Sequence, residues 1–308
     1  MNKKISFTAI IACLCICAIL GTVPAGAVEI LPGSTVSTIA LSTTANTKTT
    51  VSQKTKTKTK AKKVKKRKIP KYTKAMKKRL SKHSNTATSF GWLGSESLQK
   101  KFSKYGAYTV GNQNKKTVFL TFDEGYEYKT NTVKILNTLK KKKIKATFFI
   151  TMQFATEKPK LVKRMIKEGH TVGNHSTNHP DFTTLSTKAA YKEIKTLHDY
   201  VYKNFGYNME LFRFPQGRYS NRLLALTKEM GYHAVFWNFA QRDWDPQWDI
   251  PKSQIKNAVL SNTKNGSVYL LHAVSPSNVK ALPSVIKAVK KNGYKFGLLT
   301  NQIKKNKK

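Results

Sequence analysis

Short apolar runs alternate with amphipathic stretches from residue 116 to the end of the chain. The apolar runs are rich in Val, Ile, Leu and Phe, a composition typical of buried strands. They are residues 118–123, 146–151, 170–174, 211–214, 234–237, 268–272 and 296–299. Helical spacing of apolar positions is found in 129–143, 159–168 and 187–205, and glycines at positions 206, 231, 266 and 293 mark several boundaries.

This alternation predicts an α/β fold. Strands that are apolar throughout are buried on both faces, which is the pattern of a parallel sheet covered by helices. About seven β/α units follow one another after residue 116, so we expect a distorted, incomplete TIM-like (β/α) barrel with about seven parallel strands. A doubly wound open sheet is the alternative.

Residues 1–27 have the features of a secretory signal peptide. Lys3 and Lys4 form a basic start, residues 5–20 are mostly apolar, and Ala25-Gly26-Ala27 is a small-residue cleavage site. The apolar run is short for a membrane span, so we expect cleavage and export, with an uncleaved anchor as the alternative. All three cysteines lie within this run, and the exported chain is expected to carry no thiol and no disulfide.

Residues 28–88 are expected to form a disordered basic linker rich in Thr, Ser and Lys, followed by a catalytic domain over 89–308. The chain has 57 Lys and Arg against 15 Asp and Glu, a formal net charge of +42, and 17 of the basic residues lie between positions 48 and 82 without any acid. On an exported protein such a run favours anionic cell-wall polymers or a membrane surface over nucleic acid. A spacer without a specific ligand is the alternative, and we expect a monomer.

Polar residues stand at the ends of several apolar runs. They are Asp123, His175, Arg213, Asp243 and His272. Because the carboxyl ends of strands in a parallel barrel meet at one face, where barrel active sites lie, we expect these side chains to come together. His175 and His179 are four residues apart, and two imidazoles at this spacing can face the same way as neighbouring ligands of a divalent metal.

Five short motifs carry a family resemblance. They are TFDEG (121–125), HSTNH (175–179), RFPQG (213–217), DW (243–244) and LLH (270–272). In this order they resemble the motifs of polysaccharide deacetylases, the NodB-type carbohydrate esterases, and the resemblance extends over residues 116–300. It implies metal-assisted hydrolysis of an N-acetyl group on a sugar, which releases acetate and leaves a free amine.

The resemblance also implies a metal site and a general base. His175 and His179 match the family's histidine ligands of one divalent ion, for which zinc is favoured. Glu124 stands where many members have the aspartate that completes the ligand set, so we expect Glu124 to bind the ion together with His175 and His179; its longer side chain leaves open whether it binds directly, through water or weakly. Asp123 matches the general base, and Arg213 matches the arginine that orients this base through a charge-assisted hydrogen bond.

The remaining matched positions concern the leaving amine and the oxyanion. His272 matches the general acid, Asp243 is placed to orient it, and Trp244 would form a wall of the site. The backbone N–H of Gln216, with Gly217 in the same loop, holds the position that would stabilise the oxyanion. Members usually carry an aromatic residue in place of Gln216, so one wall of the substrate cleft is expected to differ.

One branch of the family matches best, the delta-lactam-biosynthetic de-N-acetylases of peptidoglycan. The matching stretches are residues 90–112, 120–127, 173–186, 235–244 and 268–282. The resemblance implies deacetylation of N-acetylmuramic acid after an amidase has removed the stem peptide. The product would be muramic-δ-lactam of the spore cortex, and the enzyme would act in the cell wall or the forespore intermembrane space. Arg218 and Arg242 lie beside the motifs and are candidates for binding the lactyl carboxylate.

Two other functions stay open at the level of sequence. The first is deacetylation of N-acetylglucosamine in wall glycan or chitin-like oligomers. The second is a catalytically weak protein that binds the wall, an alternative that depends on the unusual Glu124.

Overall fold

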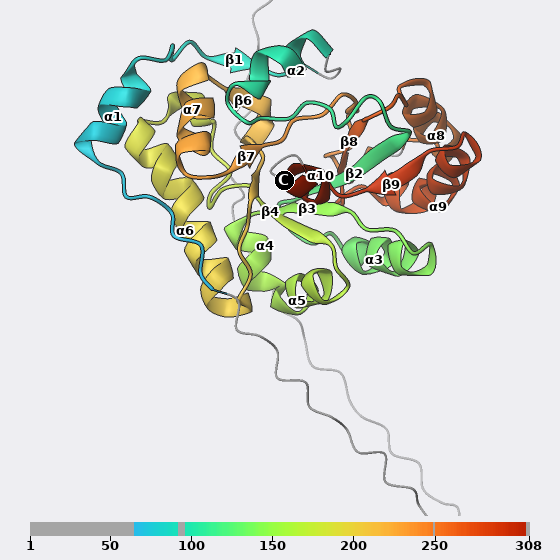
Figure 1. Ribbon diagram of the computed structural model, residues 1–308. Coiled ribbons are helices and arrows are strands. Elements are labelled where there is room, and N and C mark those ends of the chain that lie inside the picture. Colours follow the sequence, from blue (N-terminus) through green and yellow to red (C-terminus); the bar gives the residue numbers. More distant parts are fainter. Residues whose placement is uncertain (1–64, 92–95, 249, 306–308) are drawn as a thin grey trace, which may run out of the picture. The chain divides into compact units, whose positions relative to one another are not determined.

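The computed structural model describes residues 65–91, 96–248 and 250–305 (Figure 1). The predicted signal peptide and most of the predicted linker lie outside the described residues. Within the described ranges, no helix is both long enough and apolar enough to cross a membrane.

A sheet of seven strands forms the centre of the fold. Its strands are β2 (Thr117–Glu124), β3 (Thr147–Ile150), β4 (Thr171–Asn174), β5 (Leu211–Phe212), β7 (His233–Ala234), β8 (Val268–His272) and β9 (Lys295–Gly297). The order is β7-β5-β4-β3-β2-β8, and β9 pairs with the start of β2. Every pairing in this sheet is parallel, as the apolar strand pattern predicts.

The two edges of the sheet approach each other, so the sheet curls into a distorted barrel. After β7 the chain runs beside β8, where Asn238 N–H donates to Val268 O at 3.0 Å and Leu270 N–H donates to Phe239 O at 2.9 Å. Phe239 and Tyr269 form an isolated parallel bridge at this seam. These contacts confirm the barrel over the doubly wound open sheet, because an open sheet would leave both edge strands unpaired.

Helices cover the outside of the sheet (Figure 1). They are α3 (Asn131–Lys141), α4 (Met152–Glu157), α5 (Pro159–Lys167), α6 (Thr187–Phe205), α7 (Asn221–Glu229), α8 (Lys252–Ser261) and α9 (Pro276–Lys291). The helices predicted over 129–143, 159–168 and 187–205 are confirmed. For α6 the limits follow from local chemistry: the Ser186 side chain accepts from Ala189 N–H, and Gly206 ends the helix at a φ of 62°.

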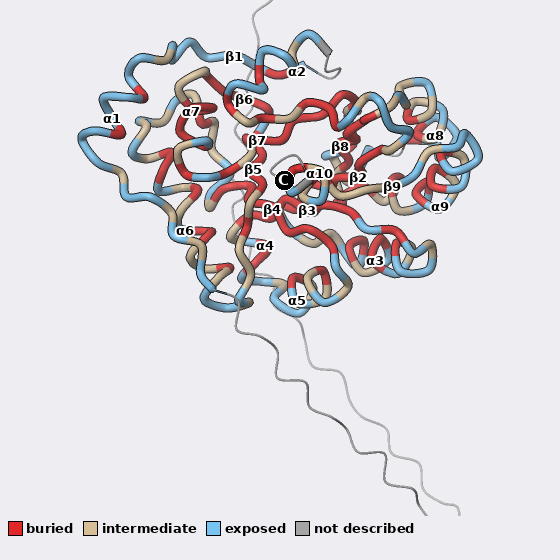
Figure 2. Tube along the Cα trace, viewed as in Figure 1, coloured by how far each residue is buried: buried red, intermediate tan, exposed pale blue. Residues whose placement is uncertain are grey.

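Buried residues fill the centre of the described chain, and exposed ones lie on the outer faces of the helices (Figure 2). Alternation along the strands divides the side chains of this interior into two layers. One face of β2 carries Val118, Leu120 and Phe122, which pack in the main core with the helices. The opposite face begins with Phe119, which belongs to a small inner core. That inner core also contains Leu299 and Ile303 of α10 (Leu299–Lys305), and α10 lies in the middle of the ring of strands in Figure 1. The predicted strand over 296–299 therefore ends at Gly297, where the chain turns into this helix.

The segment before residue 89 corrects the predicted domain boundary. Helix α1 (Lys74–Ser81) lies within the region expected to be a disordered linker, and it buries Met76 and Leu80 against α7. Arg67 donates to the carbonyls of Met230, Gly231 and Met209 at 2.7–3.0 Å. Residues 65–88 are therefore part of the folded domain, because their basic side chains have acceptors that only the fold supplies.

Three further elements are short. They are β1 (Thr88–Ser89), which pairs antiparallel with β6 (Arg218–Tyr219), and α2 (Glu96–Ser103). Two single turns, η1 (Phe182–Thr184) and η2 (Pro215–Gly217), follow the strands that carry the histidines and the arginine.

Candidate active site

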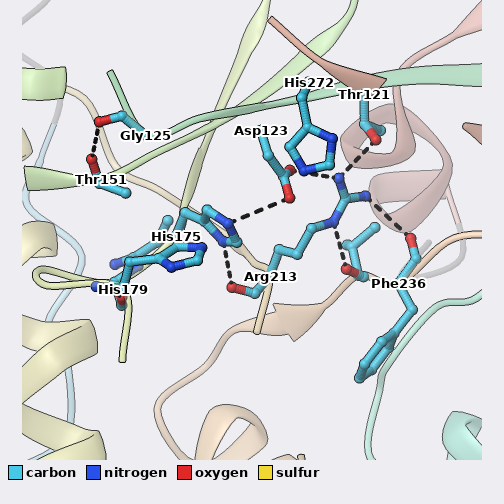
Figure 3. Close-up of polar contacts among 12 residues, drawn as sticks. Thr121, Asp123, Gly125, Thr151, His175, His179, Arg213, Phe236 and His272 are labelled. Carbon is cyan, nitrogen blue, oxygen red and sulfur yellow. Dashed lines mark hydrogen bonds and ion pairs between the residues drawn. The ribbon is translucent and has the colours of Figure 1, made fainter. Parts of the chain in front are cut away.

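Polar side chains gather at the carboxyl ends of the strands (Figure 3). Asp123 comes from β2, His175 and His179 follow β4, Arg213 follows β5, and His272 ends β8. Apart from Arg213, these side chains line a cleft of about 900 Å³. The expectation that the strand ends converge is confirmed, because parallel strands bring their carboxyl ends to one face of a barrel. No Lys or Arg is among the described residues that line the cleft.

Arg213 is a fully buried cation, and each of its three nitrogens donates at least one hydrogen bond. Its Nη1 donates to Asp123 Oδ1 at 2.8 Å and to Thr121 Oγ1 at 2.9 Å. Nε and Nη2 donate to the carbonyls of Val235 and Phe236 at 3.1 and 3.2 Å. The guanidinium also lies 4.1 Å from the centre of the Phe149 ring. A buried charge with this many partners is held in one position, and it fixes the carboxylate beside it.

Gly173 makes room for this arrangement. A Cβ at Gly173 would lie 2.4 Å from the Phe149 ring, on which Arg213 rests. A larger residue here would therefore displace the ring and the guanidinium stacked on it.

Asp123 is buried but ionised. Burial acts to raise the pKa of its carboxyl, but the charge of Arg213, together with His175 and His272, outweighs burial and holds the pKa below the ordinary value. Oδ1 is engaged by Arg213, while Oδ2 lies 3.4 Å from His175 Nε2 and faces the cleft. The free oxygen of Asp123 is therefore an available proton acceptor.

His175 and His179 lie side by side in a tight loop, with ring centres 4.7 Å apart. His175 Nδ1 contacts Arg213 O at 2.9 Å, which leaves Nε2 unprotonated toward the cleft. Burial, with the nearby charges of His179 and Arg213, lowers the pKa of His175 to about 4, and burial also lowers the pKa of His179. Both imidazoles are thus neutral at neutral pH, the form that binds a metal.

The loop that carries these histidines is held by residues that the motif did not reveal. Glu193 of α6 accepts from the N–H groups of Thr177 and Asn178 at 3.0 and 2.9 Å. Ser176 and His179 adopt positive φ values of 71° and 54°, conformations that cost energy outside glycine. The contacts of Glu193 offset this strain and aim both imidazoles into the cleft.

Glu124 does not join the two histidines. It follows Asp123 on β2, so its side chain points to the opposite face of the strand, where Thr132 Oγ1 donates to both carboxylate oxygens at 3.3 and 3.2 Å. Glu124 is fully buried and does not line the cleft. This corrects the expectation that Glu124 completes the ligand set with His175 and His179.

The described residues therefore fit a metal only in part. Among the residues that the structure describes, no group of three or more His, Cys, Asp and Glu side chains comes together in a metal-binding arrangement. His175 and His179 supply two neutral nitrogen donors, whereas the carboxylate predicted as the third ligand is directed into the helix layer. Asp123 lies near His175 through Oδ2, and its other carboxylate oxygen is bound to Arg213.

His272 and Asp243 form a hydrogen-bonded pair on the side of the cleft that β8 supplies. His272 Nδ1 lies 2.6 Å from Asp243 Oδ1, and the backbone N–H of His272 donates to Asp243 Oδ2 at 3.0 Å. Burial lowers the pKa of the His272 imidazole, but the charge and hydrogen bond of Asp243 raise it more, so the net pKa is above the ordinary value. The imidazole can therefore carry a proton at its free Nε2.

Asn278 is a member of this pair that sequence analysis did not single out. It is buried in α9, and its Nδ2 donates to Asp243 Oδ2 and, at 3.0 Å, to His272 O. Its Oδ1 accepts from Nε2 of Gln241, a residue that lines the cleft. The available signal was its position six residues after LLH, within the stretch that resembles one branch of the family.

The loop at Gln216 presents a backbone donor to the cleft. Gln216 has a φ of 56°, and its N–H has no acceptor in the described part of the chain. Gly217 differs from the expectation that it shares this role, because its N–H donates to Phe214 O at 3.1 Å. Gly217 is instead required for packing, since a Cβ there would lie 2.9 Å from Trp237.

Of the three remaining predicted site residues, only Trp244 lines the cleft, and Arg218 and Arg242 lie outside it. Trp244 lines the cleft with its ring centre 6.0 Å from that of His272, as expected. Arg218 instead forms an ion pair with Asp181 at 3.0 Å, and Arg242 lies over the Trp248 ring at 4.3 Å. Neither arginine lines the cleft, which corrects the expectation that one of them binds the sugar that is deacetylated.

Comparison with known proteins gives concordant matches. Residues 110–235 match the family model described as polysaccharide deacetylase. The chain is 40% identical over 200 residues to the peptidoglycan-N-acetylmuramic acid deacetylase PdaA of Bacillus subtilis, a match that covers 65% of this chain and 76% of that protein. It is 31% identical over 224 residues to a peptidoglycan-N-acetylglucosamine deacetylase of Bacillus cereus, covering 71% and 77%. The solved structure of Bacillus subtilis PdaA, a family 4 carbohydrate esterase, superposes with a TM-score of 0.67 at 34% identity, over 72% of this chain and 99% of that one.

Proposed function

Because the chain belongs to the polysaccharide deacetylase family, we propose that it removes the N-acetyl group from N-acetylmuramic acid in peptidoglycan. The proposal rests on one observation above all: a proton acceptor, Asp123, and a proton donor, His272, line a single cleft. Each is held by its own buried partner, Arg213 for the acceptor and Asp243 for the donor. Two groups whose surroundings favour opposite proton transfers are what amide hydrolysis requires.

The first half of the reaction uses the free oxygen of Asp123. A water molecule attacks the acetyl carbonyl carbon, and its proton passes to Asp123 Oδ2 while Arg213 keeps the other oxygen fixed. The carbonyl oxygen becomes an oxyanion, and the N–H of Gln216 is the backbone donor that stabilises it.

The second half uses His272. The carbon–nitrogen bond breaks, the amine nitrogen takes the proton from His272 Nε2, and acetate is released. Asp243 and Asn278 hold the imidazole in the orientation that leaves Nε2 free for this transfer.

Deacetylases of this family are generally metal-dependent. His175 and His179 are the side chains that would hold one divalent ion here, with zinc favoured by the two imidazoles, and the ion would supply Lewis-acid polarisation of the acetyl carbonyl. The neutral state of both imidazoles supports this assignment.

The choice of sugar is supported by the higher identity to PdaA than to the N-acetylglucosamine deacetylase, 40% against 31%. We propose that the product cyclises to muramic-δ-lactam of the spore cortex, and that the enzyme is exported by its N-terminal signal. We also propose that the basic residues before position 65 concentrate it on anionic wall polymers or a membrane surface.

The test is mass spectrometry of purified peptidoglycan after incubation with the protein, with and without prior amidase treatment. Loss of acetyl from muramic acid in amidase-treated glycan, with little change in untreated glycan, is expected. Deacetylation of N-acetylglucosamine oligomers, with amidase-treated glycan left intact, would instead establish the second candidate function, which the Bacillus cereus relative supports. The variant Asp123→Asn, which lacks the proton acceptor, is the inactive control that shows which product depends on the enzyme.

A further inference from the structure

Two of the three large exposed aromatic residues in the described part of the chain line the cleft. In the described ranges, the large apolar residues that are exposed are Tyr126, Trp244 and Trp248, at 40%, 48% and 48%. Tyr126 and Trp244 line the cleft, and Trp248 lies four residues further along the loop of Trp244. Exposed rings grouped in this way mark a binding surface, because a solvent-exposed indole gains most when it covers another apolar face.

The loop that carries Trp248 is anchored at both ends. Asp243 is bound to His272, and Ile250 N–H donates to Ser277 Oγ at 3.0 Å. Between these anchors, Trp248 N–H donates to Asp245 O at 3.1 Å. Trp248 therefore has a defined position relative to the proton donor of the site.

Arg242 lies over this indole, and none of the described residues accepts a hydrogen bond from its guanidinium. The guanidinium carbon is 4.3 Å from the centre of the Trp248 ring, and stacking of this kind uses the face of the guanidinium while its N–H edge stays available. In the part of the chain that the structure describes, Arg242 has no acidic partner, whereas Arg218 is paired with Asp181. The cleft itself is lined by no Lys or Arg in the described residues, so a carboxylate on a bound glycan finds its cation outside the cleft.

We propose that Arg242 and Trp248 form an outer subsite that binds a second carboxylate-bearing sugar of the same glycan strand. The apolar face of the sugar ring packs on Trp248, and the lactyl carboxylate accepts two N–H bonds from Arg242. This inference rests on the proposed function and adds that the enzyme selects long, peptide-free glycan, since a sugar that still carried its stem peptide would offer no free carboxylate.

The experiment compares steady-state deacetylation of two peptide-free glycan substrates, a strand of several disaccharide units and a single disaccharide. Each is used as such and with the lactyl carboxylates reduced to alcohols. The variants are Arg242→Gln, Arg242→Lys and Trp248→Ala, with Lys163→Gln, an exposed cation on α5, as the control for loss of one charge. Thermal unfolding establishes that each variant is folded.

For the long strand, Arg242→Gln and Trp248→Ala are expected to lower kcat/KM about tenfold through KM, since a remote contact binds substrate and transition state alike. Arg242→Lys should retain part of the activity, and Lys163→Gln all of it. Reduction of the lactyl carboxylates should lower kcat/KM of the wild-type enzyme about as much, and it should leave kcat/KM of Arg242→Gln unchanged. On the single disaccharide, all four variants should have the kcat/KM of the wild-type enzyme.

Unchanged ratios of long to short substrate in Arg242→Gln and Trp248→Ala would overturn the subsite while leaving the proposed function in place. Equal sensitivity of wild type and Arg242→Gln to carboxylate reduction would also overturn it. A wild-type enzyme that deacetylates neither substrate would instead refute the proposed function itself, and the subsite with it.

Discussion

The substitution Glu124→Gln tests whether Glu124 is a buried carboxyl of the helix layer or a ligand of the metal. Glu124 is fully buried, and burial, with the nearby charge of Glu127, raises its pKa well above the ordinary value of 4.5, although the hydrogen bond from Thr132 acts in the opposite direction. Above pH 4.5 the unfolded chain releases a proton that the folded chain still binds. The free energy of unfolding therefore falls as pH rises from that value to the raised pKa.

The expected gain follows from this linkage. Gln has the same shape, no proton to lose and an oxygen that still accepts from Thr132. We expect Glu124→Gln to raise the free energy of unfolding at pH 8 by about 1–3 kcal/mol, the cost typical of an incompletely compensated buried polar group, with a rise in Tm of about 2–4 °C per kcal/mol. At pH 4 the variant and the parent should be alike.

The assay is denaturant unfolding between pH 4 and 8 in the presence of a chelator, with Glu157→Gln, an exposed acid, as the control. Zinc affinity is then measured by calorimetry without chelator, and Glu124→Gln should match the parent. The reasoning is refuted if the stability difference does not depend on pH. It is also refuted if Glu124→Gln weakens zinc binding tenfold or more, the loss typical of removing a group that supports a metal.

The remaining predictions concern the histidines, the proton donor and the folded boundary. His179→Ala should abolish zinc binding in the same calorimetric measurement, and retained binding would remove it from the ligand set. Asp243→Asn should lower the pKa of the histidine that it holds and move the alkaline limb of the kcat/KM profile to lower pH, because a general acid is lost as pH rises through its pKa. Asn278→Ala removes a hydrogen bond to the carboxylate beside the imidazole and should also shift that limb, whereas a purely structural role would lower the rate equally at every pH. Removing residues 1–64 should leave Tm unchanged, but removing residues 1–88 should lower it by several degrees, because α1 and its packing are lost.

Much of the fold and part of the site follow from local pattern. The strand and helix positions were predictable because burial on both faces gives a strand a short continuous apolar run, whereas burial on one face gives a helix a period of 3.6 residues. The convergence of Asp123, His175, Arg213 and His272 was predictable for a related reason, since all parallel strands present their carboxyl ends to one face.

The sequence does not predict which way neighbouring side chains on a strand point. The strand that ends in Asp123 and Glu124 is apolar on both faces, so its sequence does not tell which face lines the cleft and which faces the helices. Only the barrel decides which face lines the cleft, because it places Phe119 in the small inner core and Phe122 in the main core. The assignment of Glu124 to the metal was wrong because a motif fixes the order of residues along the chain and not their direction in space.

By itself, then, the sequence determined the class of fold, the set of strand-end residues and the pairing of two histidines in one loop. The tertiary structure decided which polar groups meet across long stretches of chain. Asn278 reaches Asp243 from a different helix, and Arg67, within a run that looks fully solvated, finds three carbonyls more than 140 residues away. Such contacts leave no periodic signal, because a buried donor is satisfied by whichever acceptor the folded chain brings within hydrogen-bonding distance.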